Sequence, residues 1–201
     1  MKTNYVMIDM ENVKPDNLNL LDRDLFKVFL FVGKNQTKLP IAIVKAVQQL
    51  GPRAQYVEIS GTGHNALDFH IAFYIGRIAA TDKDAFFHII SNDTGFDPLI
   101  DHLKQEHVFA DRVAKIDEIP ALIQLKMASK PLSERMSFVK ERMLKPNASR
   151  PRTRKTLSSH IAAMLLKAVS DEDISNIIDG LFKDGWIREN GKRIVYSDES
   201  R

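Results

Sequence analysis

Short apolar runs alternate with helix-like stretches through the first 120 residues, and this alternation constrains the fold more than any other feature. The apolar runs cover residues 5–9, 27–33, 54–60, 86–90 and 107–113. Between them, the stretches 40–50 and 65–80 repeat apolar residues at helical spacing. Strands that are apolar along their whole length and alternate with helices indicate a parallel sheet covered on both faces. We therefore predict an α/β fold, a three-layer α/β/α sandwich around a central parallel sheet.

The alternation of strand-like and helix-like stretches does not continue after residue 125. Residues 117–144 look helical with a break near Pro131, and the basic stretch KPNASRPRTRK (145–155) is typical of a linker. Helix-like stretches at 156–166 and 170–185 then precede a hairpin pattern with Asn190 and Gly191 at its turn. This order resembles a winged-helix module, with a module that holds a partner protein as the alternative. We predict an α/β domain over 1–125, a helical and basic linker over 126–155, and a small α+β winged-helix-like domain over 156–201.

Charge is distributed unevenly along the chain. Residues 1–126 carry 14 Lys and Arg against 16 Asp and Glu, a net charge of −2, whereas residues 127–201 carry 15 against 10, a net of +5. A basic segment attached to a mildly acidic domain favours a polyanionic partner, and a solvated linker is the alternative. The chain has no cysteine, which excludes disulfides and zinc–thiolate sites. No apolar run is long enough for a membrane span, so we expect a cytoplasmic protein without a membrane partner.

Four aspartates follow or precede the predicted elements at one edge of the sheet. Ligand groups in parallel α/β folds gather at the carboxyl ends of the strands. Clustered carboxylates repel one another unless a hard cation such as Mg²⁺ balances them, and such a cluster favours phosphodiester hydrolysis. The alternative for each residue is a turn or a helix cap. The four are Asp9, Asp68, Asp93 and Asp97.

Three segments then resemble the signature segments of PIN-like nuclease domains, with the NYN-type branch and its bacterial relatives as the closest fit. They are VMIDMENV (6–13), NALDFHIAFYIGRIA (65–79) and IISNDTGFDPLI (89–100), and the resemblance extends over residues 3–116. It implies cleavage of RNA that depends on Mg²⁺ or Mn²⁺. By position, it implies that Asp9, Asp68, Asp93 and Asp97 are the catalytic residues and metal ligands, supported by Asn12 and Ser91.

Polar and basic residues near these segments are candidates for substrate binding. Lys34, Asn35 and Gln36 follow the second apolar run, and Asn65, next to His64, ends a glycine-rich loop. The basic segment can bind a phosphate backbone through counterion release, and we include Arg150, Arg152, Arg154 and Lys155. For each loop the alternative is a solvated surface. We expect Phe69, Phe73 and Phe96 in the core, and His70, His88, His102 and His107 at the surface or satisfied in the core.

The favoured hypothesis is a metal-dependent ribonuclease, an endoribonuclease, whose partner is RNA. The alternative is a nucleic-acid-binding regulator that keeps the fold but has little or no turnover. A third hypothesis is a protein-interaction module in which the acidic residues are structural. A homodimer or a protein partner bound through the C-terminal region is compatible with each of these.

Overall fold

The computed structural model describes residues 2–63, 65–191 and 193–197. The chain forms two compact units that are divided between Ile119 and Pro120. We describe each unit by itself.

The first unit is built on a five-stranded parallel sheet with the strand order β3-β2-β1-β4-β5. Its strands are β1 (Asn4–Asp9), β2 (Phe26–Val32), β3 (Ala54–Glu58), β4 (Phe86–Ile90) and β5 (Phe109–Val113). Each strand corresponds to one of the predicted apolar runs, so the predicted parallel sheet is confirmed. Because β1 is the central strand and ends at Asp9, this carboxylate lies in the middle of the carboxyl edge of the sheet.

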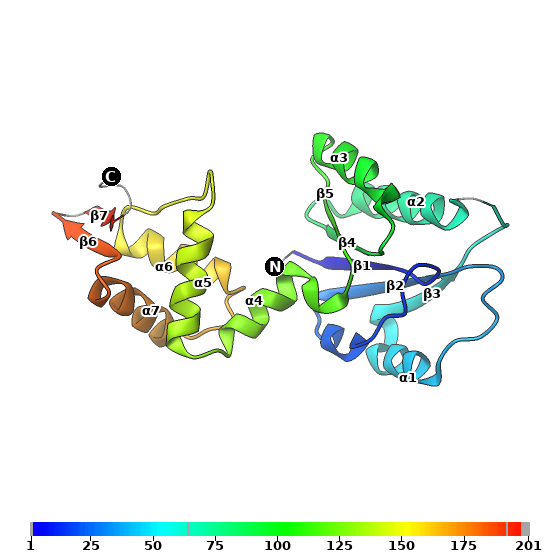
Figure 1. Ribbon diagram of the computed structural model, residues 1–201, viewed down its shortest axis with the longest axis horizontal. Helices are drawn as coiled ribbons and strands as arrows, with labels where there is room; N and C mark the ends of the chain where they lie inside the picture. Colours follow the sequence, from blue (N-terminus) through cyan, green and yellow to red (C-terminus); the bar gives the residue numbers. More distant parts are fainter. Residues whose placement is uncertain (1, 64, 192, 198–201) are drawn as a thin grey trace. The chain divides into compact units, whose positions relative to one another are not determined.

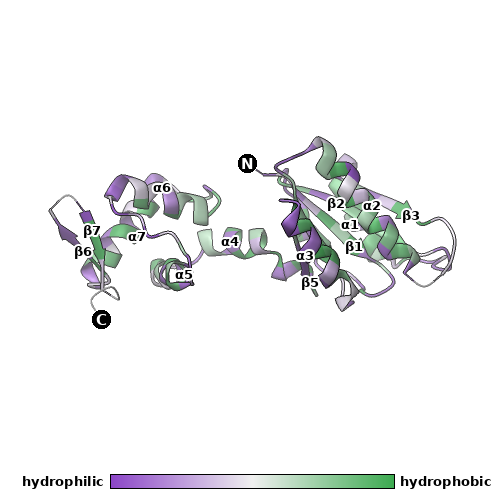
Figure 2. Ribbon diagram, turned by 90° about the horizontal axis from the view of Figure 1, so that it is seen from above, coloured by the Kyte–Doolittle hydropathy of each residue, from purple (hydrophilic) through white to green (hydrophobic). Residues whose placement is uncertain are grey.

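Helices cover both faces of this sheet (Figure 1). Helices α2 (Ala66–Thr81) and α3 (Asp97–Gln105) pack on one face, where Met7 and Ile71 belong to the same core cluster. Helix α1 (Ile41–Leu50) and the short 3-10 helix η1 (Leu18–Leu21) lie on the other face. The predicted three layers are therefore confirmed. Helix α1 is largely green in the hydropathy colouring of Figure 2.

Side-chain alternation along β1 and β4 determines the face of the sheet to which each residue at the carboxyl edge points. Tyr5 and Met7 lie in the core under α2 and α3, as do Phe87 and Ile89 of β4. Since successive side chains of a strand point to opposite faces, Asp9 at the end of β1 points to the α2 side. Ile90 points to the side of α1 and η1.

The second unit contains four helices and a two-stranded antiparallel hairpin in the described part of the chain. These are α4 (Pro120–Ala128), α5 (Leu132–Leu144), α6 (Arg154–Met164), α7 (Asp171–Lys183), β6 (Ile187–Asn190) and β7 (Arg193–Tyr196). The predicted break near Pro131 is confirmed. Helix α7 begins with a capping box, in which the Ser170 hydroxyl accepts from the Asp173 amide. The order of helices and hairpin fits an additional module, as predicted.

Helix α5, which falls in the segment predicted as a linker, contributes to the core of the second unit. Val139 and Met143 of α5 are fully buried against Leu157 of α6 and Leu181 of α7. The three-part division at residues 125 and 155 stays a prediction, because compactness does not test which segments fold independently. In the described residues, no helix has the length and apolarity that a membrane crossing requires.

Candidate functional site

Asp9 is a buried carboxylate that accepts four hydrogen bonds. Its side chain is 0% exposed. Oδ1 accepts from the main-chain amides of Glu11 and Asn12, each at 3.1 Å. Oδ2 accepts from Asn12 Nδ2 and from the Ser91 hydroxyl, each at 2.7 Å. A buried charge is tolerated only when donors replace its water shell. Asn12 and Ser91, predicted as supporting residues, therefore hold the orientation of Asp9.

Ser91 links this carboxylate to the segment after β4. Its hydroxyl oxygen accepts from the Asp93 amide at 3.0 Å while it donates to Asp9. Asp93 in turn caps the 3-10 helix η3 (Thr94–Phe96), because its Oδ1 accepts from the Gly95 amide at 2.7 Å. No described residue donates a hydrogen bond to Asp93 Oδ2, so this oxygen can accept a further partner.

Asp97 is the first residue of α3, and its carboxylate is held by an arginine. Arg112 of β5 donates from Nε and Nη2 to the two Asp97 oxygens at 2.8 and 3.2 Å, and from Nη1 to the Ser91 carbonyl at 3.2 Å. The hydrogen bond from this guanidinium lowers the pKa of the exposed Asp97 carboxyl below its usual value. Sequence reasoning missed Arg112. The available signal was a basic residue near the end of the fifth predicted strand, at the same sheet edge.

The carboxylates are not gathered into one metal centre in this arrangement. Asp68 lies half-buried in the first turn of α2. Within residues 2–63, 65–191 and 193–197, no three His, Asp or Glu side chains lie close enough to hold a metal ion. Four protein donors contact the Asp9 carboxylate, and Arg112 is paired with Asp97. Carboxylate oxygens fit Mg²⁺ or Mn²⁺ in kind, but here protein donors and a guanidinium balance the charges.

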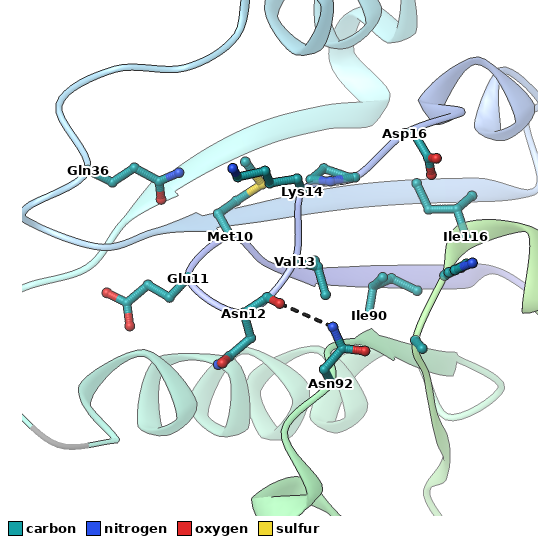
Figure 3. Close-up of a pocket in the computed structure, with 13 residues that line it drawn as sticks. Met10, Glu11, Asn12, Val13, Lys14, Asp16, Gln36, Ile90, Asn92 and Ile116 are labelled. Carbon is teal, nitrogen blue, oxygen red and sulfur yellow. Dashed lines mark hydrogen bonds between the residues drawn. The ribbon is translucent and has the colours of Figure 1, made fainter.

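Several predicted substrate-binding residues lie at the same edge of the first unit. Lys34 and Gln36 line a pocket of about 300 Å³ in the loop after β2, and Asn35 is exposed between them. Gln36 also lines a pocket of about 460 Å³ beside β1 (Figure 3). Asn65 is the exposed N-cap of α2 in the left-handed conformation, at φ 63°. The prediction for His64 falls outside the described residues.

The four predicted basic residues belong to the second unit and have different surroundings. Arg150 donates from Nε to the Met143 carbonyl at 3.1 Å, which ties it to the end of α5. Arg154 pairs with Asp179 of α7. The other two, Arg152 and Lys155, line an open groove of about 680 Å³ along α6. The structure therefore places Arg150 and Arg154 in contacts within the second unit. Arg152 also has a partner in the structure, and it lines the surface groove together with Lys155.

The aromatic expectations are confirmed in part. Phe96 is buried at 2% exposure, but Phe69 and Phe73 on α2 are 70% and 60% exposed, so their prediction as core residues is wrong. The prediction failed because α2 turns this part of its apolar surface away from the sheet. His88 is buried as predicted for a satisfied core histidine, with its ring nitrogens 2.8 Å from Asn4 Oδ1 and 2.7 Å from Asp111 Oδ1.

The first unit is thus an α/β domain with a hydrogen-bonded acidic site at the carboxyl edge of its parallel sheet. The PIN7 model of the PIN domain matches residues 3–113, which is more than half of the 201 residues. The chain belongs to the PIN domain family, whose members are generally nucleases and commonly depend on metal ions. No curated protein and no solved structure matches the chain.

Proposed function

We propose that this protein is a metal-dependent endoribonuclease that hydrolyses phosphodiester bonds at the carboxyl edge of its parallel sheet. The observation that carries the proposal is the connection Asp9–Ser91–Asp93. One hydroxyl joins the Asp9 carboxylate at the end of β1 to the main-chain amide of Asp93, just after the neighbouring strand β4. Membership of the PIN domain family supports the nuclease class. The absence of cysteine suits a cytoplasmic setting, which we include in the proposal.

In this proposal, Asp9, Asp68, Asp93 and Asp97 would hold Mg²⁺ or Mn²⁺ once their side chains move closer together than they lie in this structure. A bound divalent ion supplies Lewis-acid stabilisation of the phosphate and makes a bound water more acidic. The protein itself supplies orientation. Asn12 and Ser91 fix the Asp9 carboxylate, Ser91 also fixes the Asp93 main chain, and Asp93 presents its Oδ2. Lys34, Asn35, Gln36 and Asn65 contact the strand near the site.

The second unit provides affinity for the nucleic-acid backbone in a winged-helix-like manner. Helix α7 exposes Asp171 and Glu172 in its first turn, which repels phosphates. We therefore assign the contact to the groove along α6 that Arg152 and Lys155 line. Changing both residues to Gln should reduce the slope of log K against log salt by roughly 1.4, since each phosphate contact contributes about 0.7 for single strands. The comparison is the slope measured for the unchanged protein with single-stranded RNA.

A second candidate function is a nucleic-acid-binding regulator with little or no turnover. The observation that favours it is the neutralisation of the acidic site by protein groups. Asp9 is saturated with donors, and Asp97 is paired with Arg112. In that case the PIN domain binds a strand without cutting it.

The deciding experiment is cleavage of labelled single-stranded RNA, duplex RNA and single-stranded DNA in Mg²⁺, Mn²⁺ or EDTA. The test variant is Asp93→Asn, because asparagine retains an oxygen that can accept from the Gly95 amide and so preserves the cap of η3. The matched control is Asp101→Asn, an exposed aspartate of α3 paired with Lys104. We expect metal-dependent cutting of RNA that Asp93→Asn abolishes and the control retains.

Other results would separate the alternatives. Salt-sensitive binding of RNA without any cutting by the unchanged protein would favour the regulator. Neither cutting nor binding would leave the acidic residues with a structural role and direct attention to a protein partner. Cutting that survives Asp93→Asn would remove Asp93 from the mechanism.

A further inference from the structure

A pocket of about 460 Å³ lies next to the acidic site but on the other face of the sheet, the face of α1 and η1 (Figure 3). Its apolar walls come from Met10, Val13, Ile90 and Ile116. Ile90 points away from α2, whereas Asp9 points toward it, so the pocket and the acidic site are separated by the edge of the sheet. The volume falls within the range of small-molecule sites, roughly 300–1,000 Å³.

Asn12 connects the pocket to the acidic site. Its side-chain amide donates to Asp9 Oδ2 at 2.7 Å on one side. On the other side its main-chain carbonyl accepts from Asn92 Nδ2 at 3.3 Å, and both residues line the pocket. Figure 3 shows this hydrogen bond at the pocket wall. A strand that crosses the edge at Asn12 would therefore reach both places with neighbouring nucleotides.

One buried polar atom of the pocket residues lacks a partner. Gln36 Oε1 is inaccessible to solvent and accepts no hydrogen bond from the described residues. Figure 3 shows the Gln36 side chain directed toward Met10 from the loop after β2. An unsatisfied buried acceptor costs free energy, and such groups in native proteins call for an explanation. Because Oε1 is inaccessible here, the Gln36 amide has to turn into the pocket for the hydrogen-bond donor of a ligand to satisfy it.

Cationic side chains on the pocket wall complete its chemistry. Lys14 and Lys115 are exposed there, and neither has a carboxylate partner among the described residues. The two anionic residues of the lining are placed differently. The Glu11 carboxylate occupies the space above Gly33, and Asp16 lies at the end of the pocket opposite Gln36 in Figure 3. Exposed lysines suit phosphate groups.

We propose that this pocket binds one nucleotide of the substrate strand. The base lies against the apolar walls, Gln36 and Asn92 pair with its polar edge, and Lys14 and Lys115 both contact its phosphate. The apolar walls match the face of a base, the side-chain amides match its polar edge, and the nearby cations match its phosphate. This inference deepens the proposed nuclease function. It rests on that function for the assumption that the bound strand continues from the pocket to the acidic site.

The test is equilibrium binding of the four 5′-mononucleotides to the full-length protein in EDTA, by calorimetry or by amide chemical shifts. Ribose 5-phosphate and inorganic phosphate serve as ligands without a base. We expect at least one mononucleotide to bind about tenfold more tightly than ribose 5-phosphate, the effect of one or two net hydrogen bonds plus apolar contact. The perturbed amides should include those of Gln36 and Asn92.

Two variants with matched controls locate the site. Gln36→Leu removes the amide at similar size and should weaken mononucleotide binding about tenfold, while Gln49→Leu on the exposed side of α1 should not change it. Lys115→Met should weaken mononucleotides and ribose 5-phosphate alike, while Lys45→Met should not. Gln36→Leu removes an unsatisfied acceptor, so thermal melting should show no loss of stability. If Gln36→Leu does lose stability, Lys115→Met provides the second test of the site.

The outcomes separate this inference from the proposed cleavage. Mononucleotide binding that Asp93→Asn retains, with or without cutting by the unchanged protein, supports the pocket whatever the fate of the nuclease proposal. If no mononucleotide binds, or if ribose 5-phosphate binds equally well and Gln36→Leu has no effect, the pocket assignment is overturned. Failure of the pocket assignment would not change the interpretation of the cleavage experiment.

Discussion

Asp9 carries a charge that the fold buries completely, and this demands donors from two distant parts of the chain. The amides of the following turn supply one side, and Asn12 and Ser91 supply the other. Ser91 is the residue on which both neighbours depend, because it donates to Asp9 and accepts from Asp93. Its loss would leave a carboxylate oxygen under-satisfied and an amide without its acceptor.

Ser91→Ala should therefore lower the free energy of unfolding by about 1–3 kcal/mol, the cost of leaving buried polar groups unpaired. Urea denaturation monitored by circular dichroism measures the change. The control is Thr81→Ala, which removes an exposed hydroxyl at the end of α2 and should stay within about 0.5 kcal/mol. An unchanged stability of Ser91→Ala would show that water replaces the hydroxyl.

Arg112 is placed to balance carboxylates in the absence of a cation. Arg112→Met should therefore allow Mn²⁺ to bind more tightly by up to roughly fivefold, because exposed charge pairs contribute up to about 1 kcal/mol. Calorimetric titration of Mn²⁺ into the two proteins gives the comparison. Weaker binding in the variant would instead mean that Arg112 positions Asp97 for the ion.

Tyr5 gives the first unit a predictable response to alkaline pH. Burial, reinforced by the hydrogen bond of its hydroxyl to Asp82 at 3.0 Å, raises the pKa of the Tyr5 phenol from 10.0 to about 12. A raised pKa in the folded state means that the stabilisation is complete below pH 10 and is lost as the pH rises through about 12. Denaturation should show a loss of up to roughly 2 kcal/mol over this range. Tyr5→Phe should lack this component, and an identical pH profile for the variant would contradict it.

At the scale of elements, the sequence was sufficient for most of the architecture. Apolar runs determine strands because burial on both faces requires apolar residues along the whole strand, and all five predicted runs lie in strands of the parallel sheet. Side-chain partners were harder to predict because they depend on strand register. Arg112 reaches the site because it pairs with Ile89 across β4 and β5. The exposure of Phe69 and Phe73 could have been predicted, because the helical spacing of Leu67, Ile71 and Ile75 defines the buried face of α2. Phe69 and Phe73 lie two residues away from that face, on the opposite side of the helix.

Gly180 of α7 lies directly against the side chain of Met136 of α5. A Cβ at Gly180 would lie 2.5 Å from Met136 Sδ and 3.0 Å from Met136 Cε. Gly180→Leu should therefore cost about 1–3 kcal/mol through overpacking. Combined with Met136→Ala, it should cost less than the sum of the two single changes. Fluorescence of Trp186 during urea denaturation reports on this unit, and strict additivity would show that the two side chains do not compete for space.

At the scale of the whole molecule, charge and structure divide at the same place. Residues 1–119 carry 13 Lys and Arg against 16 Asp and Glu, a net of −3, and residues 120–201 carry 16 against 10, a net of +6. In the proposed function, the second unit attracts a polyanion and the first needs a cation to approach it. Binding by the whole protein should therefore weaken with salt more than cleavage chemistry does.

Because the units have separate cores, they should unfold in separate transitions. Trp186 is the only tryptophan and belongs to the second unit, so its fluorescence follows that unit alone. Circular dichroism follows both. We expect the two signals to have different midpoints in urea, and addition of a bound mononucleotide should shift only the transition of the first unit. Coincident transitions that shift together would show that the units unfold as one.

The central position of β1 also has a consequence for protein synthesis. Both neighbours of this strand are made after it, and the Ser91 hydroxyl that Asp9 requires is 82 residues further along the chain. At roughly 5–20 residues per second, a ribosome needs about 4–16 s to add that length. During this interval the carboxylate is hydrated and the strand is unpaired on its β4 side. The acidic site is therefore among the last parts of the first unit to mature on a nascent chain.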